Sequence, residues 1–130
     1  MTDAVKKVLE ENIWYIATYD EEPNVVPVGF KSVTDDGKLH IAAVLLETTM
    51  NNIKKNGKIA IAACDMATME AYQIKGKAEF VTEGPVYDAF VKLAEDTFKG
   101  AFATKCEICV TPEKIIVSSP SPDNKKELAL

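Results

Sequence analysis

The feature that most constrains the fold is a two-residue alternation of side-chain type within residues 70–82, which is regular from Tyr72 to Phe80. Apolar or small side chains occupy every second position, and charged or polar side chains stand between them. The apolar set is Tyr72, Ile74, Gly76, Ala78 and Phe80. Because side chains of a strand point alternately to its two faces, this pattern predicts a β-strand with one buried face.

Further segments have the β-branched and aromatic composition typical of strands. They lie at residues 13–18, 25–34, 39–46, 59–64 and 106–118. Most of these segments are separated by short polar turns, and Asp35-Asp36-Gly37 is a strong β-hairpin signal. Strands joined in this way favour an antiparallel sheet. A dinucleotide-binding βαβ fold fits poorly, because no glycine-rich turn follows the first strand.

Three helices are expected beside the strands. Thr2 caps the first, the second runs from Thr48 to Asn56, and the third spans residues 85–99. Together these elements predict one mainly β domain over residues 1–130, a six-stranded antiparallel barrel with flanking helices. Residues 119–130 are expected to form a polar tail.

Three of the expected strands have unusual features. Pro27 and Gly29 interrupt the segment at 25–34, so this strand lies at an edge or is bulged there. The segments 39–46 and 59–64 are apolar on both faces and need cover on both. The barrel core covers one side, and the 85–99 helix or a second copy of the chain covers the other. A homodimer is favoured, and a well-covered monomer is the alternative.

Charge and composition exclude several classes of function. The chain of 130 residues has net charge −5, and all fifteen basic residues are lysine. A negative chain without arginine is a poor nucleic-acid binder, so no nucleic-acid partner is expected. No apolar run is long enough to span a membrane, and no signal peptide is evident. Three sparse cysteines fit a reducing compartment, and a cytoplasmic protein is expected.

The segment from residue 47 to residue 57 is the first candidate site. It leaves an apolar strand and enters a helix whose first turn contains Thr48 and Thr49. The free N–H groups of a helix N-terminus suit an anion, and two hydroxyls add donors. Ordinary capping of the helix by Thr48 is the alternative interpretation.

Two other clusters give weaker signals. Cys106 and Cys109 have CxxC spacing but fall in a predicted strand, where residues three apart face opposite ways. His40 is the only histidine and lies within a strand, which favours a structural role over a catalytic triad. No metal site and no catalytic residue are predicted.

Four segments together resemble the FMN-binding split-barrel family, which includes pyridoxamine 5′-phosphate oxidase and the small FMN-binding proteins. They are Trp14-Tyr15-Ile16-Ala17-Thr18, Pro23-Asn24-Val25-Val26-Pro27-Val28-Gly29-Phe30, Thr48-Thr49-x-x-Asn52-Ile53-x-x-Asn56 with Lys58-Ile59-Ala60-Ile61, and Ile74-Lys75-Gly76-Lys77-Ala78-Glu79-Phe80 with Glu83-Gly84-Pro85. The resemblance covers residues 2 to about 118 and implies a homodimer that binds FMN at the subunit interface.

The resemblance also implies which residues hold the cofactor. The ring is expected against two strands, and the phosphate at the helix start with Asn52 supporting the turn. The residues that carry over are Pro27, Val28, Gly29, Ala43, Val44, Leu45, Leu46, Thr48, Thr49 and Asn52. Family members commonly have lysine or arginine where this chain has Thr48. Either another base compensates, for which the candidates are Lys31, Lys54, Lys55 and Lys58, or FMN binds weakly.

The function implied by the resemblance is redox chemistry on FMN: flavin reduction, reduction of a small substrate, or electron transfer. The Arg–His pair that marks true pyridoxamine 5′-phosphate oxidases is missing, which argues against vitamin B6 oxidation. Two alternatives stay open at this point. One is a barrel that stores a flavin or haem without turnover, and the other is a dimeric barrel that has lost its cofactor.

Overall fold

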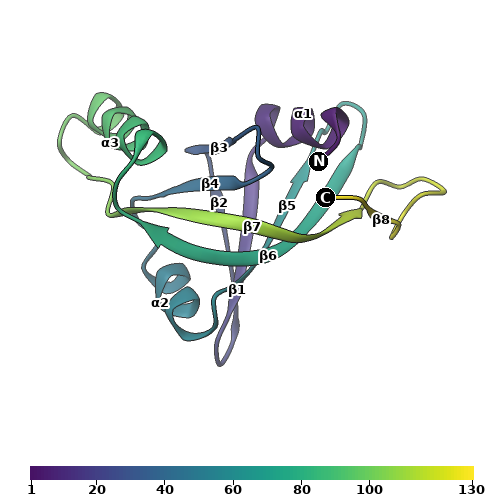
Figure 1. Cartoon of the computed structure of the whole chain (residues 1–130), viewed down its shortest axis with the longest axis horizontal. Coiled ribbons are helices and arrows are strands. Elements are labelled where there is room, and N and C mark those ends of the chain that lie inside the picture. The colour runs from purple at the N-terminus through teal and green to yellow at the C-terminus, as the bar shows by residue number, and fades with distance from the viewer.

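The computed structural model describes all 130 residues and contains one curled antiparallel sheet with three helices around it (Figure 1). The strands are β1 (Trp14–Tyr19), β2 (Pro23–Val28), β3 (Lys31–Val33), β4 (Leu39–Ala43), β5 (Lys58–Cys64), β6 (Ala71–Val81), β7 (Cys106–Val117) and β8 (Glu127–Leu128). The helices are α1 (Asp3–Glu11), α2 (Glu47–Asn56) and α3 (Pro85–Phe98). None of the helices is long and apolar enough to cross a membrane.

The strand order is β2-β1-β5-β6-β7-β4-β3, and β8 adds to β7. The mainly β antiparallel architecture is confirmed, but the prediction of six strands is wrong, since the sheet has eight. One extra strand arises because the expected strand at 25–34 breaks in two. The other arises because the expected polar tail folds back, and Leu128 pairs with Ile115 of β7.

The break between β2 and β3 puts one stretch of chain at both edges of the sheet. β2 pairs with β1, whereas β3 pairs with β4 at the other end of the strand order. Gly29 and Phe30 lie at the break, and the Phe30 carbonyl accepts a hydrogen bond of 3.0 Å from the amide of Ala42. The interruption predicted at Gly29 is therefore confirmed, whereas Pro27 lies within β2, which is an edge strand as its proline predicts. One continuous stretch of chain supplies both edges of the sheet.

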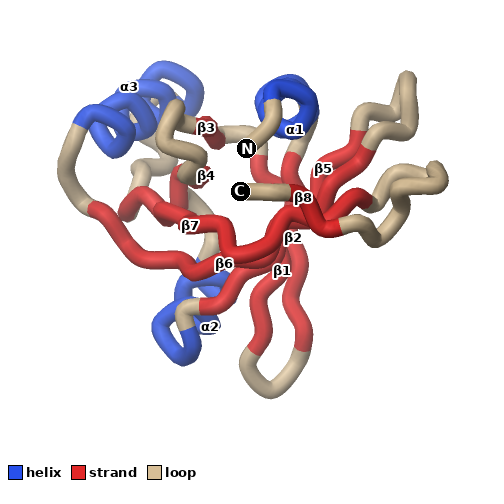
Figure 2. Tube along the Cα trace, turned by 45° about the vertical axis from the view of Figure 1, so that its right-hand side comes forward, coloured by secondary structure: helices blue, strands red, loops and turns tan.

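The main core lies inside the curled sheet and is closed by two helices. The alternation at 70–82 is confirmed, since Tyr72 and Ile74 of β6 are buried in this core. Val8 of α1 and Ile53 of α2 join the same cluster. In Figures 1 and 2, α1 and α2 lie at opposite ends of the curled sheet, and both pack on the core inside it. Thr2 caps α1 as predicted, accepting a hydrogen bond of 3.3 Å from the Val5 amide.

The two strands predicted to be apolar on both faces receive different cover. Every residue of β4 is buried, and on its outer side Ala42 packs with Phe90 and Ala94 of α3. The outer side of β5 has no such helix, and Ala62 is exposed there. One helix therefore covers one of the two strands, and the outer face of β5 remains open in the single chain.

Candidate cofactor site

The junction between β4 and α2 exposes an uncapped helix start. β4 ends at Ala43, three residues earlier than expected, and the chain turns through Val44 to Leu46. Leu46 is the N-cap of α2, and no side chain caps this helix. The first helical amide with a backbone acceptor is that of Met50, which donates to Leu46 at 2.9 Å. The alternative in which Thr48 caps the helix is therefore wrong, and Thr48 is exposed in the first turn.

Two buried side chains anchor this helix to the sheet. The Asn52 amide donates to the Thr18 hydroxyl of β1 at 3.0 Å, and both residues are buried. The Asn24 amide of β2 donates to the Thr49 hydroxyl at 3.4 Å. Thr49 is only 1% exposed, so it offers its backbone N–H rather than a free hydroxyl to anything bound at the helix start. Asn52 and Thr49 thus fix where the helix N-terminus points.

The residues expected along the ring divide into an exposed and a buried group. Pro27, Gly29 and Leu45 are exposed, and Leu46 is half-buried. Val28, Ala43 and Val44 are buried, the first two in the main core and the last against α3. The exposed group therefore presents side chains at the surface, whereas the buried group presents at most its backbone.

Lys31 is not available as the missing base. Its amine donates to the carbonyl oxygens of Leu9 at 2.9 Å and Glu10 at 3.2 Å, at the last turn of α1. It also lies 5.2 Å from the centre of the Trp14 ring. Desolvation by burial lowers the pKa of Lys31. This lysine satisfies the carbonyl end of α1, where a cation also interacts favourably with the helix dipole.

Two other lysines lie near the end of β4. The Lys105 amide donates to the Ala43 carbonyl at 2.8 Å, which places this residue beside the junction. Burial raises the pKa of the Cys106 thiol, and the positive charges of Lys54 and Lys105 oppose that rise. Sequence reasoning missed Lys105, because no local pattern links it to a helix that begins at residue 47. Only the pairing of β4 with β7 brings it there.

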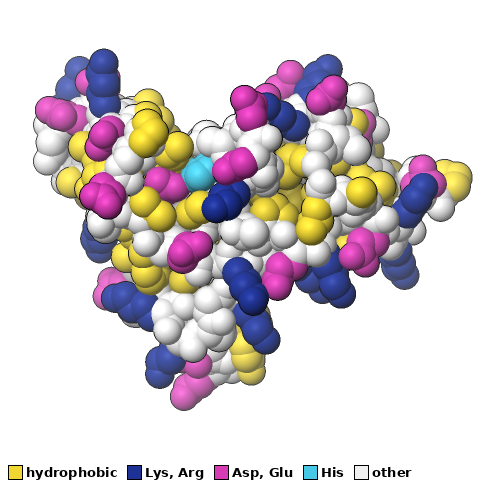
Figure 3. All heavy atoms as spheres, viewed as in Figure 1, with side chains coloured by type: hydrophobic (Ala, Val, Ile, Leu, Met, Phe, Trp, Pro, Cys, Tyr) yellow, Lys and Arg dark blue, Asp and Glu magenta, His cyan; other side chains and the backbone are white.

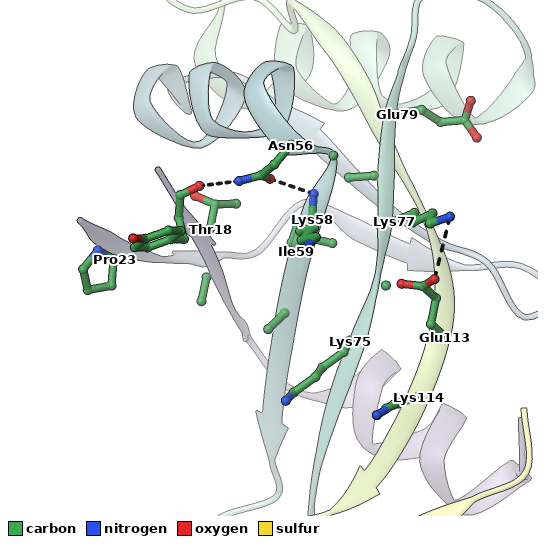
Figure 4. Close-up of a pocket in the computed structure, with 16 residues that line it drawn as sticks. Thr18, Pro23, Asn56, Lys58, Ile59, Lys75, Lys77, Glu79, Glu113 and Lys114 are labelled. Atoms are coloured by element: carbon green, nitrogen blue, oxygen red, sulfur yellow. Dashed lines mark hydrogen bonds and ion pairs between the residues drawn. The ribbon is translucent and has the colours of Figure 1, made fainter. Parts of the chain in front are cut away.

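A large cavity lies on the outer face of the sheet, away from the start of α2. It is a groove of about 880 Å³ over β1, β5, β6 and β7 (Figure 4). Its lysines are Lys58, Lys75, Lys77 and Lys114, and its carboxylates are Glu79 and Glu113. In Figure 4 Lys77 points toward Glu113, with nitrogen and oxygen 3.9 Å apart. The groove is open, and its floor includes Gly76 and Ala60.

A curled antiparallel sheet whose two edge strands come from one broken stretch of chain, with a short helix soon after β4, defines a split-barrel protein. A sequence model of the pyridoxamine 5′-phosphate oxidase family matches residues 1–119, and the chain belongs to this family. The resemblance found in the sequence is thus confirmed. No curated protein matches the chain significantly in sequence.

Three of the solved structures that match this chain illustrate the shared fold. HupZ from Group A Streptococcus has a TM-score of 0.79 and 27% sequence identity, over 95% of this chain and 98% of that chain. An FMN-binding protein from Syntrophomonas wolfei subsp. wolfei has a TM-score of 0.75 and 18% identity, over 88% of this chain and 83% of that chain. HutZ, the heme storage protein from Vibrio cholerae, has a TM-score of 0.63 and 14% identity, over 88% of this chain and 92% of that chain.

Proposed function

We propose that this protein binds FMN as a homodimer and works in redox chemistry, as a flavin-dependent oxidoreductase or an electron-transfer protein. The observation that carries the proposal is the uncapped N-terminus of α2, which leaves helix N–H groups free at a position where the family resemblance implies a phosphate. A phosphate at such a helix start accepts several N–H hydrogen bonds and meets the positive end of the helix dipole.

The residues around the junction fit a phosphate monoester. The exposed Thr48 hydroxyl adds a donor to the free amides of the first turn. Lys54 and Lys105 supply positive charge nearby, in a chain whose net charge is −5. Glu47, exposed in the same turn, opposes an anion. Together these donors and charges predict a site that holds the FMN phosphate mainly through backbone N–H groups and binds FMN more weakly than a site with arginine would.

The flavin ring, when bound, supplies hydride and electron transfer, and the protein supplies a dry and oriented slot. Pro27, Gly29 and Leu45 are the exposed residues proposed to contact the ring, and Leu45 is 66% exposed in the single chain. An open surface of this kind excludes water from a ring only when a second surface closes over it. A partner subunit is the proposed cover.

The outer face of β1, β2 and β5 supports the homodimer. Tyr15, Tyr19 and Val25 are all more than half exposed on this face. The register places Tyr15 between Pro27 on one side and Ala62 on the other, so the apolar surface is continuous across the three strands. A contiguous apolar patch on a folded chain is typical of a protein interface.

Storage of haem is less well supported than flavin binding. The single histidine, His40, is only 6% exposed and does not line the large groove on the outer face of the sheet, so it is not placed to ligate a haem there. The heme storage protein HutZ shares only the fold with this chain, at 14% identity. A non-enzymatic flavin carrier differs from an oxidoreductase only in turnover, and assays of NAD(P)H consumption on the FMN-loaded protein separate the two.

The phosphate placement is tested by comparing FMN with riboflavin, which lacks the phosphate. Thr48→Val and Lys105→Ala should weaken FMN binding, by about tenfold and about threefold, and leave riboflavin binding unchanged. Lys92→Ala, an exposed lysine on α3, is the matched control. Fluorescence quenching of each flavin on titration gives the dissociation constants. Equal losses for both ligands, or no binding of FMN by the unmodified protein, would contradict the placement.

The homodimer is tested separately by sedimentation equilibrium. Ala62→Glu places a charge at an exposed position of the open β5 face and should shift the protein toward monomer. Ala67→Glu, at an exposed position of the β5–β6 turn, is the control and should leave the association state unchanged. A protein that is monomeric at all concentrations would refute this part of the proposal.

A further inference from the structure

The outer face of β3, β4 and β7 brings together side chains that the cofactor site does not use. The strand register places Ser32, His40, Cys109 and Glu79 in one row across four strands. Glu107 stands two residues before Cys109 on the same face of β7. Directly opposed residues of neighbouring strands have side chains in contact range. This row therefore gathers nitrogen, sulfur and oxygen donors at one point of the sheet.

We propose that His40, Glu107 and Cys109 form a binding site for a divalent transition metal, best fitted by Zn²⁺. The ligand atoms of these three residues lie within 4.8 Å of one another, and all three residues are buried. Nδ1 of His40 and Oε2 of Glu107 are 2.5 Å apart, with side chains only 8% and 4% exposed. One imidazole, one thiolate and one carboxylate, with a fourth position left for water, are a donor set that zinc accepts in tetrahedral sites.

A second observation, the hydrogen bonding of the other His40 ring nitrogen, also supports metal binding. The other ring nitrogen, Nε2, lies 2.9 Å from the Thr34 hydroxyl, which itself donates to the Asp36 carboxylate at 2.5 Å. Hydrogen bonds from Thr34 and from the Lys38 amide lower the pKa of Asp36. A histidine whose far nitrogen is tied, directly or through a hydroxyl, to a carboxylate is the usual support of a metal ligand, because the support fixes the ring orientation. Here that support holds Nδ1 toward Glu107.

The chemistry of binding is a replacement of protons by the metal. A metal binds an imidazole nitrogen and a thiolate only where they carry no proton, so any proton on Nδ1 of His40 or on the Cys109 sulfur leaves to solvent as the metal enters. Without the metal, burial raises the pKa of the Cys109 thiol, and the charges of Glu107 and Glu79 add to the rise. The same negative charges that disfavour a bare thiolate favour a bound cation.

The cluster lies close to the molecular surface. In Figure 3 the histidine, drawn in cyan, is partly visible in a hollow beside α3, with an acidic side chain next to it. α2 lies on the opposite side of the sheet in Figure 1, so this cluster is separate from the FMN junction. The proposal of a metal site is therefore independent of the proposed FMN binding. Local sequence patterns miss the cluster, because Glu107 is 67 residues from His40 in the chain.

The site is tested on protein without a histidine tag, titrated with ZnCl₂ and, as a spectroscopic probe, with CoCl₂. The wild type should bind one ion per chain, release protons, and show the near-ultraviolet charge-transfer band of a thiolate bound to cobalt. Cys109→Ala should remove the band and weaken Zn²⁺ binding by at least about tenfold. Cys106→Ala is the matched control, because it lies on the same strand but faces the main core. It should bind like the wild type.

Two further variants keep the test decisive if Cys109→Ala folds poorly. Glu107→Gln preserves the shape but removes the anionic ligand, and Thr34→Val removes the support of His40; each should weaken Zn²⁺ binding by about 10–100-fold. Thermal unfolding with and without Zn²⁺ should show a stabilisation in wild type and Cys106→Ala that is reduced or lost in the other variants. Zinc binding that is equal in all variants, or absent from the wild type, would overturn the proposal and leave a purely structural His–Glu pair.

Discussion

The hydrogen bond between Asn52 and Thr18 should be a main support of α2, and removing its acceptor tests that role. In Thr18→Val the side chain keeps its size, but the Asn52 amide, only 6% exposed, loses the partner that it holds at 3.0 Å. A buried donor left without an acceptor costs about 1–3 kcal/mol. Against a typical domain stability of about 5–15 kcal/mol, this loss is easily measured. The FMN affinity should fall with it, since the bond holds the helix start in place.

The free energy of unfolding is measured by urea unfolding, monitored by tryptophan fluorescence. Trp14 is the only tryptophan and is fully buried, so its fluorescence reports on the core. Asn51→Ala, at the exposed neighbouring helix position, is the control and should change stability by less than about 0.5 kcal/mol. The double variant Thr18→Val with Asn52→Leu should cost less than the sum of the single variants, because no polar group is left unpaired. Additive losses, or a Thr18→Val protein as stable as the wild type, would refute this account of the junction.

Three further predictions follow from other parts of the sheet. Gly76→Ala should destabilise the protein by about 1–3 kcal/mol in urea unfolding, because a Cβ at this position would lie 2.5 Å from a backbone oxygen. Gly29→Ala is the control and should hardly change stability, because a Cβ at Gly29 would have no atom within 4 Å. Burial raises the pKa of Tyr72 from 10.0 to about 12, so the free energy of unfolding should fall as the pH rises from 10 to 12, and Tyr72→Phe should reduce that slope. Mild oxidation should form no bridge between Cys106 and Cys109, whose Cα atoms are about 10 Å apart along an extended strand, and thiol titration after denaturation checks this.

The elements that sequence predicted well are those whose signal is local. Alternation over residues 70–82 is a property of neighbouring residues, and it gave β6 almost to its ends. Thr2 capped α1 as expected, and Gly57 ended α2 with a left-handed backbone conformation. These cases depend on side-chain periodicity or on one residue's backbone preference, both of which are readable without the rest of the fold.

The features that sequence missed depend on distant parts of the chain. The last residues form β8 only because β7 presents a free edge at Ile115 and Ile116. Lys31 looked free to bind an anion, but the fold brings it to the end of α1. Lys105 was overlooked because it is far from residue 47 in the sequence, and only strand pairing places it beside Ala43. A charge can be counted in a sequence, but its partner is set by tertiary structure.

The break at Gly29 also has a consequence for how the sheet avoids pairing with other molecules. In an antiparallel pair, alternate residues direct their backbone groups to the same side, so Pro23, Val25 and Pro27 share one side of β2. Proline has no N–H, so that side is the free one, and Val25 alone has a hydrogen to donate there. The opposite edge, β3, is only three residues long. Neither edge is a good template for a foreign strand, which protects the barrel against edge-to-edge aggregation even though its flat apolar face is open.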